Sequence, residues 1–276
     1  MNTTNTKKIG HMFKTLSPNG LTPNDIPELK DFQLTLSSKG SCAEFYHAKE
    51  VKSSCVCGIK KISKSENFKK GWDRWKLKDN VKREIQIHST LDNKYVISLY
   101  GYFEDNDNYY LILEDADDDL YYHRLTSAGK FLTLEEKTTL KYIKMVAIGL
   151  QYIHNNGIVH KDIKIENLVI RDGDIKIIDF GLSEYINAQV DTFFGTTEYK
   201  APEIGDKAYA TKETDIYALG VTTYVLLHGA YPKFPLKFGS YVSKDCEELI
   251  SRMTNTFGRI TLEEFFEVEI IKKIEL

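Results

Sequence analysis

The 276-residue sequence predicts an α+β fold built as two lobes. Residues 32–113 contain five short segments rich in β-branched and aromatic side chains, with one segment of helical periodicity among them. Beyond residue 119 the hydrophobic pattern becomes mostly helical. Hydrophobic residues make up 42% of the chain, which is enough to bury a large core. We therefore expect a sheet-rich amino-terminal lobe followed by a helical carboxy-terminal lobe.

The amino-terminal lobe is preceded by a polar segment, residues 1–30, whose prolines and scattered Asn and Thr indicate an extension outside the core. Five strands are expected, forming one antiparallel sheet, at residues 32–36, 44–48, 56–62, 96–103 and 109–113. Residues 104–108 have the composition of a hairpin loop. Apolar positions between Lys78 and Leu91 recur with the period of a helix, which becomes the main helix of this lobe.

The second lobe begins with a long helix expected at Leu134–Asn155, ending near Gly157. Two short apolar strands, residues 168–170 and 175–178, then flank the turn Arg171-Asp172-Gly173-Asp174. An Asp-Gly turn between apolar runs is a strong hairpin signal. This hairpin would bring its two flanking residues, Asn167 and Asp179, close together in space.

Composition excludes several classes of function. The net charge of −3 gives no argument for nucleic acid, and we interpret the basic stretch 69–83, with its two tryptophans, as a solvated helix flank. No apolar run approaches the ~20 residues needed to span a bilayer. The start of the chain lacks a signal peptide, and four cysteines form neither a disulfide framework nor a zinc pattern. We expect an intracellular, cytoplasmic protein with access to the nucleus.

The most informative stretch is His160-Lys161-Asp162-Ile163-Lys164-Ile165-Glu166-Asn167, followed by Asp179-Phe180-Gly181. Asp162 has the chemistry to accept a proton from a hydroxyl nucleophile, and Lys164 to neutralise a migrating phosphoryl group. Asn167 and Asp179 offer the hard oxygen ligands that magnesium prefers. Either motif alone recurs by chance, but the two together, in this order, indicate phosphoryl transfer.

In combination these motifs resemble the protein kinase family, in its serine/threonine branch and in a style similar to the polo and aurora groups. The resemblance covers residues 32–272. It implies a two-lobed protein-kinase-like domain over 31–276, with an N-lobe at 31–115, a C-lobe at 116–276 and a nucleotide cleft between them. The implied cofactors are ATP and Mg²⁺, with Mn²⁺ as a substitute, and Asp162 would be the catalytic base.

The resemblance also assigns ATP-binding positions. Lys60 would contact the α- and β-phosphates while paired with Glu84, and Gly58 replaces the usual alanine over the adenine. Leu113 would lie at the back of the adenine pocket, next to backbone that bonds the base. The remaining nucleotide positions are Ser38, Gly40, Ala43, Phe45, Glu114, Ala116, Asp119 and Val169.

Serine/threonine specificity is implied by Lys164 together with Thr196, which would bond Asp162 and Lys164. Scaffold roles fall to Glu203, expected to pair with Arg259, and to Asp215, expected to hold the backbone of the catalytic loop. The partners implied are protein substrates carrying Ser or Thr. Asp119 suggests a preference for basic flanking residues, while the sequence leaves the oligomeric state open.

Two departures leave alternatives open. Where kinases show Gly-x-Gly-x-x-Gly, residues 38–43 read Ser-Lys-Gly-Ser-Cys-Ala, so we expect weakened nucleotide affinity. Lys161 replaces an arginine that often grips an activating phosphate, so Thr192 is either a regulatory site or a plain loop residue. The first alternative function is a weakly active kinase or pseudokinase scaffold. The second is a small-molecule phosphotransferase of related fold.

Overall fold

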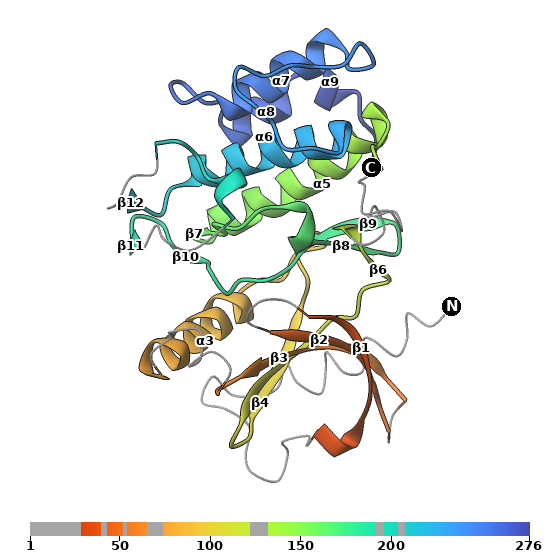
Figure 1. Ribbon diagram of the computed structural model, residues 1–276, viewed down its shortest axis with the longest axis vertical. Helices are drawn as coiled ribbons and strands as arrows, with labels where there is room; N and C mark the ends of the chain where they lie inside the picture. Colours follow the sequence, from red (N-terminus) through yellow and green to blue (C-terminus); the bar gives the residue numbers. More distant parts are fainter. Residues whose placement is uncertain are drawn as a thin grey trace. The chain divides into compact units, whose positions relative to one another are not determined.

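The computed structural model describes residues 29–39, 43–51, 54–65, 74–121, 132–190, 196–203 and 208–276. The chain divides into two compact units, drawn in Figure 1. The first contains the described residues up to Thr90 together with Ile97–Ala116, and the second contains Leu91–Val96 together with Asp117–Leu276.

The first unit is built on one five-stranded antiparallel sheet in the order β1-β2-β3-β5-β4. The strands are β1 (Phe32–Lys39), β2 (Glu44–Glu50), β3 (Val56–Ser63), β4 (Leu99–Glu104) and β5 (Asn108–Leu113), preceded by the short helix η1 (Leu29–Asp31). The predicted five-stranded sheet is therefore confirmed. The prediction was wrong about the start of the fourth strand, because β4 begins at Leu99 rather than at Val96. Val96 instead forms a parallel bridge with Ile177 in the second unit.

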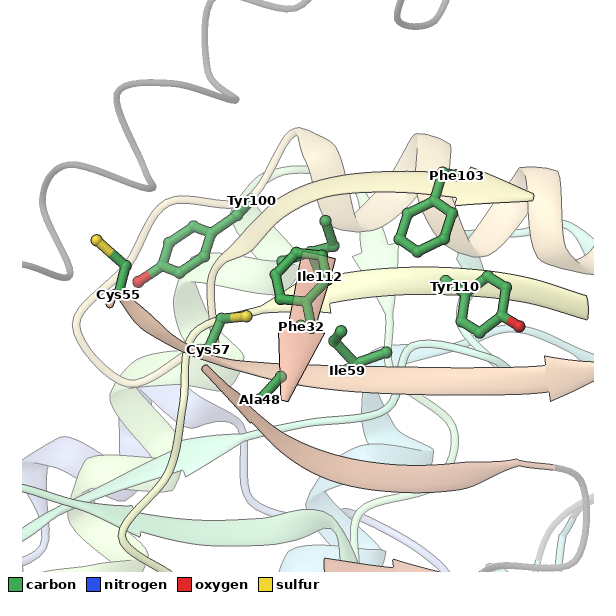
Figure 2. Close-up of a cluster of buried hydrophobic side chains, with 9 residues drawn as sticks. All are labelled: Phe32, Ala48, Cys55, Cys57, Ile59, Tyr100, Phe103, Tyr110 and Ile112. Atoms are coloured by element: carbon green, nitrogen blue, oxygen red, sulfur yellow. The ribbon is translucent and has the colours of Figure 1, made fainter. Parts of the chain in front are cut away.

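Two apolar clusters cover the two faces of this sheet. Figure 2 shows the larger one, whose nine buried side chains are Phe32, Ala48, Cys55, Cys57, Ile59, Tyr100, Phe103, Tyr110 and Ile112. Because side chains alternate along a strand, Lys60 and Ile62 of β3 face the other way. On that second face Ile62 and Leu111 pack with Leu77 and Val81 of helix α3 (Arg74–Ser89). The helix begins four residues before the predicted start, and Leu91 lies beyond its end.

The second unit is mainly helical, as predicted. Its helices are α5 (Glu136–Asn155), α6 (Lys212–His228), α7 (Lys244–Thr254), α8 (Leu262–Glu267) and α9 (Glu269–Lys272). Helix α6 is buried along Asp215–Leu227 and packs between α5 and α7, which explains why it is apolar around its whole circumference. A Cβ at Gly220 would lie 2.8 Å from Met253 Cβ, so glycine allows α7 to approach closely.

A short hairpin in the second unit joins β8 (Leu168–Arg171) to β9 (Asp174–Ile177). Asp172 and Gly173 have positive φ angles of 52° and 83°, the geometry of the hairpin turn that Asp-Gly favours. The backbone N–H of Ile178 donates to the carbonyl oxygen of Asn167 at 3.0 Å. The hairpin expected from the sequence is confirmed, and it places the chain at Asn167 beside the chain that enters Asp179.

The other elements of the second unit are short. They are β6 (Asp118–Asp119), β7 (Ile158–Val159), η2 (Ile165–Asn167), β10 (Glu184–Tyr185), β11 (Gln189–Val190), η3 (Thr197–Tyr199) and β12 (Ala208–Tyr209). Residues 229–243, all of them described, connect α6 to α7 without forming a helix. In the described part of the chain no helix has the length and apolar character to cross a membrane.

Candidate active site

The carboxylate of Asp162 lies at the centre of the candidate catalytic site. Lys164 Nζ is 2.7 Å from Asp162 Oδ2, and Asn167 Nδ2 donates to the same oxygen at 2.8 Å. The hydroxyl of Thr196 is 3.5 Å from Asp162 Oδ1 and accepts a hydrogen bond from Lys164 Nζ at 2.8 Å. One cation and two neutral groups thus surround a carboxylate that is 8% exposed. The sequence had grouped these four residues, and the structure brings them together.

Asp215 of α6 binds the backbone of the loop that carries Asp162. The Asp215 carboxylate accepts the backbone N–H groups of His160 and Lys161, each at 2.8 Å, and lies 2.9 Å from His154 Nε2. Lys161 has a φ of 69°, a conformation that costs free energy in a residue with a Cβ. Complete burial pushes the pKa of Asp215 upward, but His154 and these backbone donors outweigh it and hold the pKa below its ordinary value. The expected role of Asp215 in holding this loop is confirmed.

Asn167 and Asp179 are the two residues that the sequence predicts as ligands of a divalent cation. Asn167 donates through Nδ2 to the backbone oxygen and the side chain of Asp162, both at 2.8 Å, which leaves the amide oxygen as the atom suited to a metal. Asp179 has a φ of 65°, and its Oδ1 accepts the N–H of Gly181 at 3.1 Å. In the described residues no three His, Cys, Asp or Glu side chains form a ready metal cluster. One amide and one carboxylate fit Mg²⁺ when phosphate and water supply its other ligands.

Lys60 and Glu84 form a buried ion pair within the first unit. Lys60 Nζ donates to Glu84 Oε1 at 2.5 Å, and the two residues are 5% and 4% exposed. The pair joins β3 to α3. Lys60 Nζ also lies 5.9 Å from the centre of the Phe45 ring, because Phe45 and Lys60 are register partners on β2 and β3. The pairing expected from the sequence is confirmed.

Gly58 lies where β3 approaches the end of β5. A Cβ on Gly58 would lie 3.3 Å from the carbonyl oxygen of Glu114, so glycine permits a closer approach than alanine would. Glu114 is held in turn by Ser98, since the Glu114 N–H donates to the Ser98 oxygen at 2.9 Å and the Ser98 N–H donates to Glu114 Oε2 at 3.2 Å. Asp115 pairs with His47 Nδ1 at 2.8 Å, a contact that the sequence did not indicate.

The remaining predicted nucleotide residues fall in both units. Ser38 is the second-to-last residue of β1, Ala43 precedes β2, and Leu113 and Ala116 lie at and just after the end of β5. In the second unit Val169 is buried on β8, and the backbone of Asp119 pairs with it. Gly40 and Thr192 lie outside the described residues, as does the side chain of Asp119.

A long-range ion pair anchors the segment that follows Thr196. Arg259 donates from Nη1 to Glu203 Oε1 at 2.5 Å and from Nη2 to Glu203 Oε2 at 3.0 Å. The same Nη1 donates to the backbone oxygen of Glu213 at 2.8 Å, and the guanidinium lies 5.0 Å from the centre of the Tyr217 ring. The expected pairing of these two residues is confirmed, in the two-pronged geometry that arginine favours.

The sequence gave no sign that Glu166 differs from a solvated carboxylate. In the described structure Glu166 Oε2 is buried without a hydrogen-bond partner, and burial raises the pKa of this carboxyl. Glu166 stands directly before Asn167 in the catalytic stretch, a position that does not by itself indicate burial. A buried carboxylate oxygen without a partner suits a cationic group from another molecule.

Comparison with known proteins decides the family. The model of the protein kinase domain matches residues 38–269. The chain belongs to the protein kinase family. This kinase is similar to the Aurora kinase of Schizosaccharomyces pombe, with 33% identity over 288 residues, covering 95% of the chain and 79% of the relative. It is 31% identical to the Aurora kinase of Candida glabrata over 279 residues, which cover 91% of the chain and 75% of that relative. The Aurora kinase of Dictyostelium discoideum is 31% identical over 264 residues, which cover 89% of the chain and 67% of that relative.

These relatives confirm the aurora-like style inferred from the motifs. The protein is an ATP-dependent serine/threonine protein kinase with an α+β kinase fold, and it acts on protein substrates. Nothing in these relatives favours the pseudokinase alternative.

Proposed function

We propose that Asp162 is the catalytic base of this kinase. The substrate hydroxyl oxygen forms a bond to the γ-phosphorus of ATP, the bond from that phosphorus to the bridging oxygen breaks, and ADP leaves. The hydroxyl proton passes to Asp162, and Lys164 stabilises the negative charge on the transferred group. The observation that carries this proposal is the environment of the Asp162 carboxylate, held by Lys164 and Asn167 at 2.7 and 2.8 Å.

The metal ligands of the proposal are Asn167 and Asp179. When bound, Mg²⁺, or Mn²⁺ as a substitute, supplies positive charge that offsets the charge of the phosphates. The Asn167 side chain supports this role because Asp162 orients it through its nitrogen. Asn167 thus serves the catalytic loop with its nitrogen and the cation with its oxygen.

The nucleotide-binding part of the proposal rests on Lys60. Its ammonium, fixed by Glu84, binds the α- and β-phosphates, while the backbone from Glu114 to Ala116 bonds the adenine. The side chains assigned to the adenine and ribose are Phe45, Gly58, Leu113, Asp119 and Val169. Ser38, Gly40 and Ala43 form the phosphate-covering loop, whose loss of glycines reduces ATP affinity without abolishing it.

We propose a preference for basic residues before the target Ser or Thr. Glu166 supports it, because its buried Oε2 without a partner would gain a hydrogen bond from a substrate arginine or lysine. Asp119 is the second carboxylate that we assign to this preference, on the basis of its position in the sequence. A positional peptide library tests this proposal, since uniform phosphorylation across basic, neutral and acidic flanks would contradict it.

An intracellular, cytoplasmic location with access to the nucleus completes the proposal. Among the described residues, Cys57 and Cys246 are buried free thiols, which fits a reducing compartment. Burial raises the pKa of Cys57 and Cys246 to about 12, so neither thiol is reactive. Fractionation of cells carrying the tagged protein tests the location, and recovery in the secreted fraction would contradict it.

The decisive experiment for function uses Mg-ATP labelled at the γ-phosphate. We expect label on serine and threonine of a mixed protein substrate, identified by phosphoamino-acid analysis. The same enzyme is offered kanamycin and choline as acceptors. Labelling of either small molecule without labelling of protein would favour a small-molecule phosphotransferase, and background labelling of everything would favour a scaffold.

A further inference from the structure

Three side chains, two from the neighbouring strands and one from β2 itself, converge on the carboxylate of Glu44, the first residue of β2. Lys39 Nζ is 2.8 Å from Glu44 Oε1, and the hydroxyl of Tyr46 donates to Oε2 at 2.8 Å. Lys61 Nζ is 3.2 Å from the same Oε2. Lys39 on β1 and Lys61 on β3 are the register partners of Glu44 on its two sides. The carboxylate therefore links three strands at one end of the sheet.

The partners of Glu44 stabilise the charged form of its carboxyl group. The hydrogen bond from Lys39, then those from Tyr46 and Lys61, lower the pKa of this carboxyl to about 2. A single exposed Lys–Glu pair contributes little, because solvent and salt screen it. Here two ammonium groups and one hydroxyl share a carboxylate whose side chain is 23% exposed, and the half-buried Tyr46 packs against the apolar cluster of Figure 2. The contacts form a network, which is the case in which surface charges contribute measurably.

The network lies on the face of the sheet opposite to the proposed nucleotide residues. Side chains alternate along a strand, so Phe45 and Lys60, the next register pair, face the other way from Glu44 and Lys61. Glu44 is thus unsuited to touch a nucleotide held by Lys60. Its influence must pass through the backbone, by fixing the register of β1, β2 and β3.

That register matters at this end of the sheet. Ser38 and Ala43, which stand where kinases carry glycine, lie next to Lys39 and Glu44 in the sequence. A residue with a Cβ has fewer accessible backbone conformations than glycine, so these positions depend more on the strands that hold them. The β-bulge between Leu36 and Ser38 shifts the β1–β2 register, and after this shift Lys39 is paired with Glu44.

We propose that Glu44 is a positioning residue for ATP binding: by joining Lys39, Tyr46 and Lys61 it holds Ser38, Ala43, Phe45 and Lys60 in register. This inference rests on the proposed function of those four residues as nucleotide contacts.

The test is steady-state kinetics of Glu44→Gln in the 276-residue kinase. We expect KM for ATP to rise about fivefold, with kcat within about twofold, because a network contact is lost and no reacting group is touched. Tyr46→Phe removes one donor only and should raise KM for ATP about twofold. Calorimetric titration should show that the affinity for ADP falls more in Glu44→Gln than in Tyr46→Phe.

The matched control is Glu104→Gln, which breaks the ion pair of Lys64 Nζ with Glu104 Oε2 at 2.7 Å elsewhere on the same sheet. It should leave KM for ATP unchanged. An equal rise in KM for both Gln variants, or a fall in kcat at constant KM in Glu44→Gln, would overturn the inference.

Lys60→Met separates this inference from the proposed function on which it rests. If Lys60→Met weakens ADP binding and neither Glu44→Gln nor Tyr46→Phe does, the positioning role fails alone. If Lys60→Met leaves ADP binding intact, the assignment of the nucleotide site fails first. Should Glu44→Gln not fold, Tyr46→Phe carries the test, and unchanged KM for ATP in that variant contradicts the proposal.

Discussion

Lys60 and Glu84 form a 2.5 Å ion pair, almost fully buried, that joins β3 at the centre of the sheet to helix α3. Removing one partner of a buried pair leaves the other charge without compensation. We expect Glu84→Gln to lower the free energy of unfolding by about 3 kcal/mol and phosphate transfer by at least about tenfold.

Urea denaturation and transfer kinetics measure these two effects. Asp79→Asn, at an exposed position of the same helix, is the control and should change neither quantity. Wild-type activity in a folded Glu84→Gln enzyme would mean that the pair only stabilises the fold.

Thr196 links Lys164 to the edge of the Asp162 carboxylate. We expect Thr196→Ala to reduce kcat about tenfold, because Lys164 loses its 2.8 Å hydrogen-bond partner and the carboxylate loses a neighbour. Thr196→Ser keeps the hydroxyl and should retain most of the activity. Steady-state kinetics with a serine peptide distinguishes the two variants, and equal losses in both would assign the effect to the methyl group instead.

The buried carboxylate of Asp215 should make stability depend on pH in the acid range. Its pKa in the folded protein lies below the ordinary value, so its charge stabilises the fold above the unfolded pKa of about 4. This contribution is lost as the pH falls through the folded pKa. We expect Asp215→Asn to cost about 2 to 3 kcal/mol at pH 7. The difference between the two proteins should shrink at pH 3, as measured by chemical denaturation, and a constant difference across this range would contradict the assignment.

Arg259 is held by a two-pronged contact to Glu203 and by the ring of Tyr217. Lysine has one ammonium group and reproduces neither the fork nor the stacking. We expect Arg259→Lys to lower the free energy of unfolding by about 1 to 2 kcal/mol and to lower the melting temperature accordingly. Arg252→Lys on α7, an exposed arginine, is the control and should leave the melting temperature unchanged.

The features that the sequence predicted well are local ones. The β8–β9 hairpin depends on a four-residue turn between two apolar runs, so its register follows from neighbouring residues. The catalytic stretch was equally readable, because Asp162, Lys164 and Asn167 lie within six residues. Lys60, Glu84 and Arg259 were found through the family resemblance, since nothing in a lone charged residue reveals a distant partner.

The features that the sequence missed depend on contacts between distant segments. Val96 looked like part of a strand of the first unit, but it belongs to the second unit, where it pairs with Ile177. The Glu44 network depends on a β-bulge that no pattern in the sequence predicted. Glu166 gave no signal because burial without a hydrogen-bond partner is a property of the folded chain.

The central claim is that Asp162 serves as the base for phosphate transfer, and single-turnover transfer by Asp162→Asn tests it most directly. With ATP and a serine peptide saturating, we expect the transfer rate to fall at least about 100-fold while the affinity for ADP stays within about twofold. A transfer rate near that of the wild type, with ADP binding intact, would contradict the account.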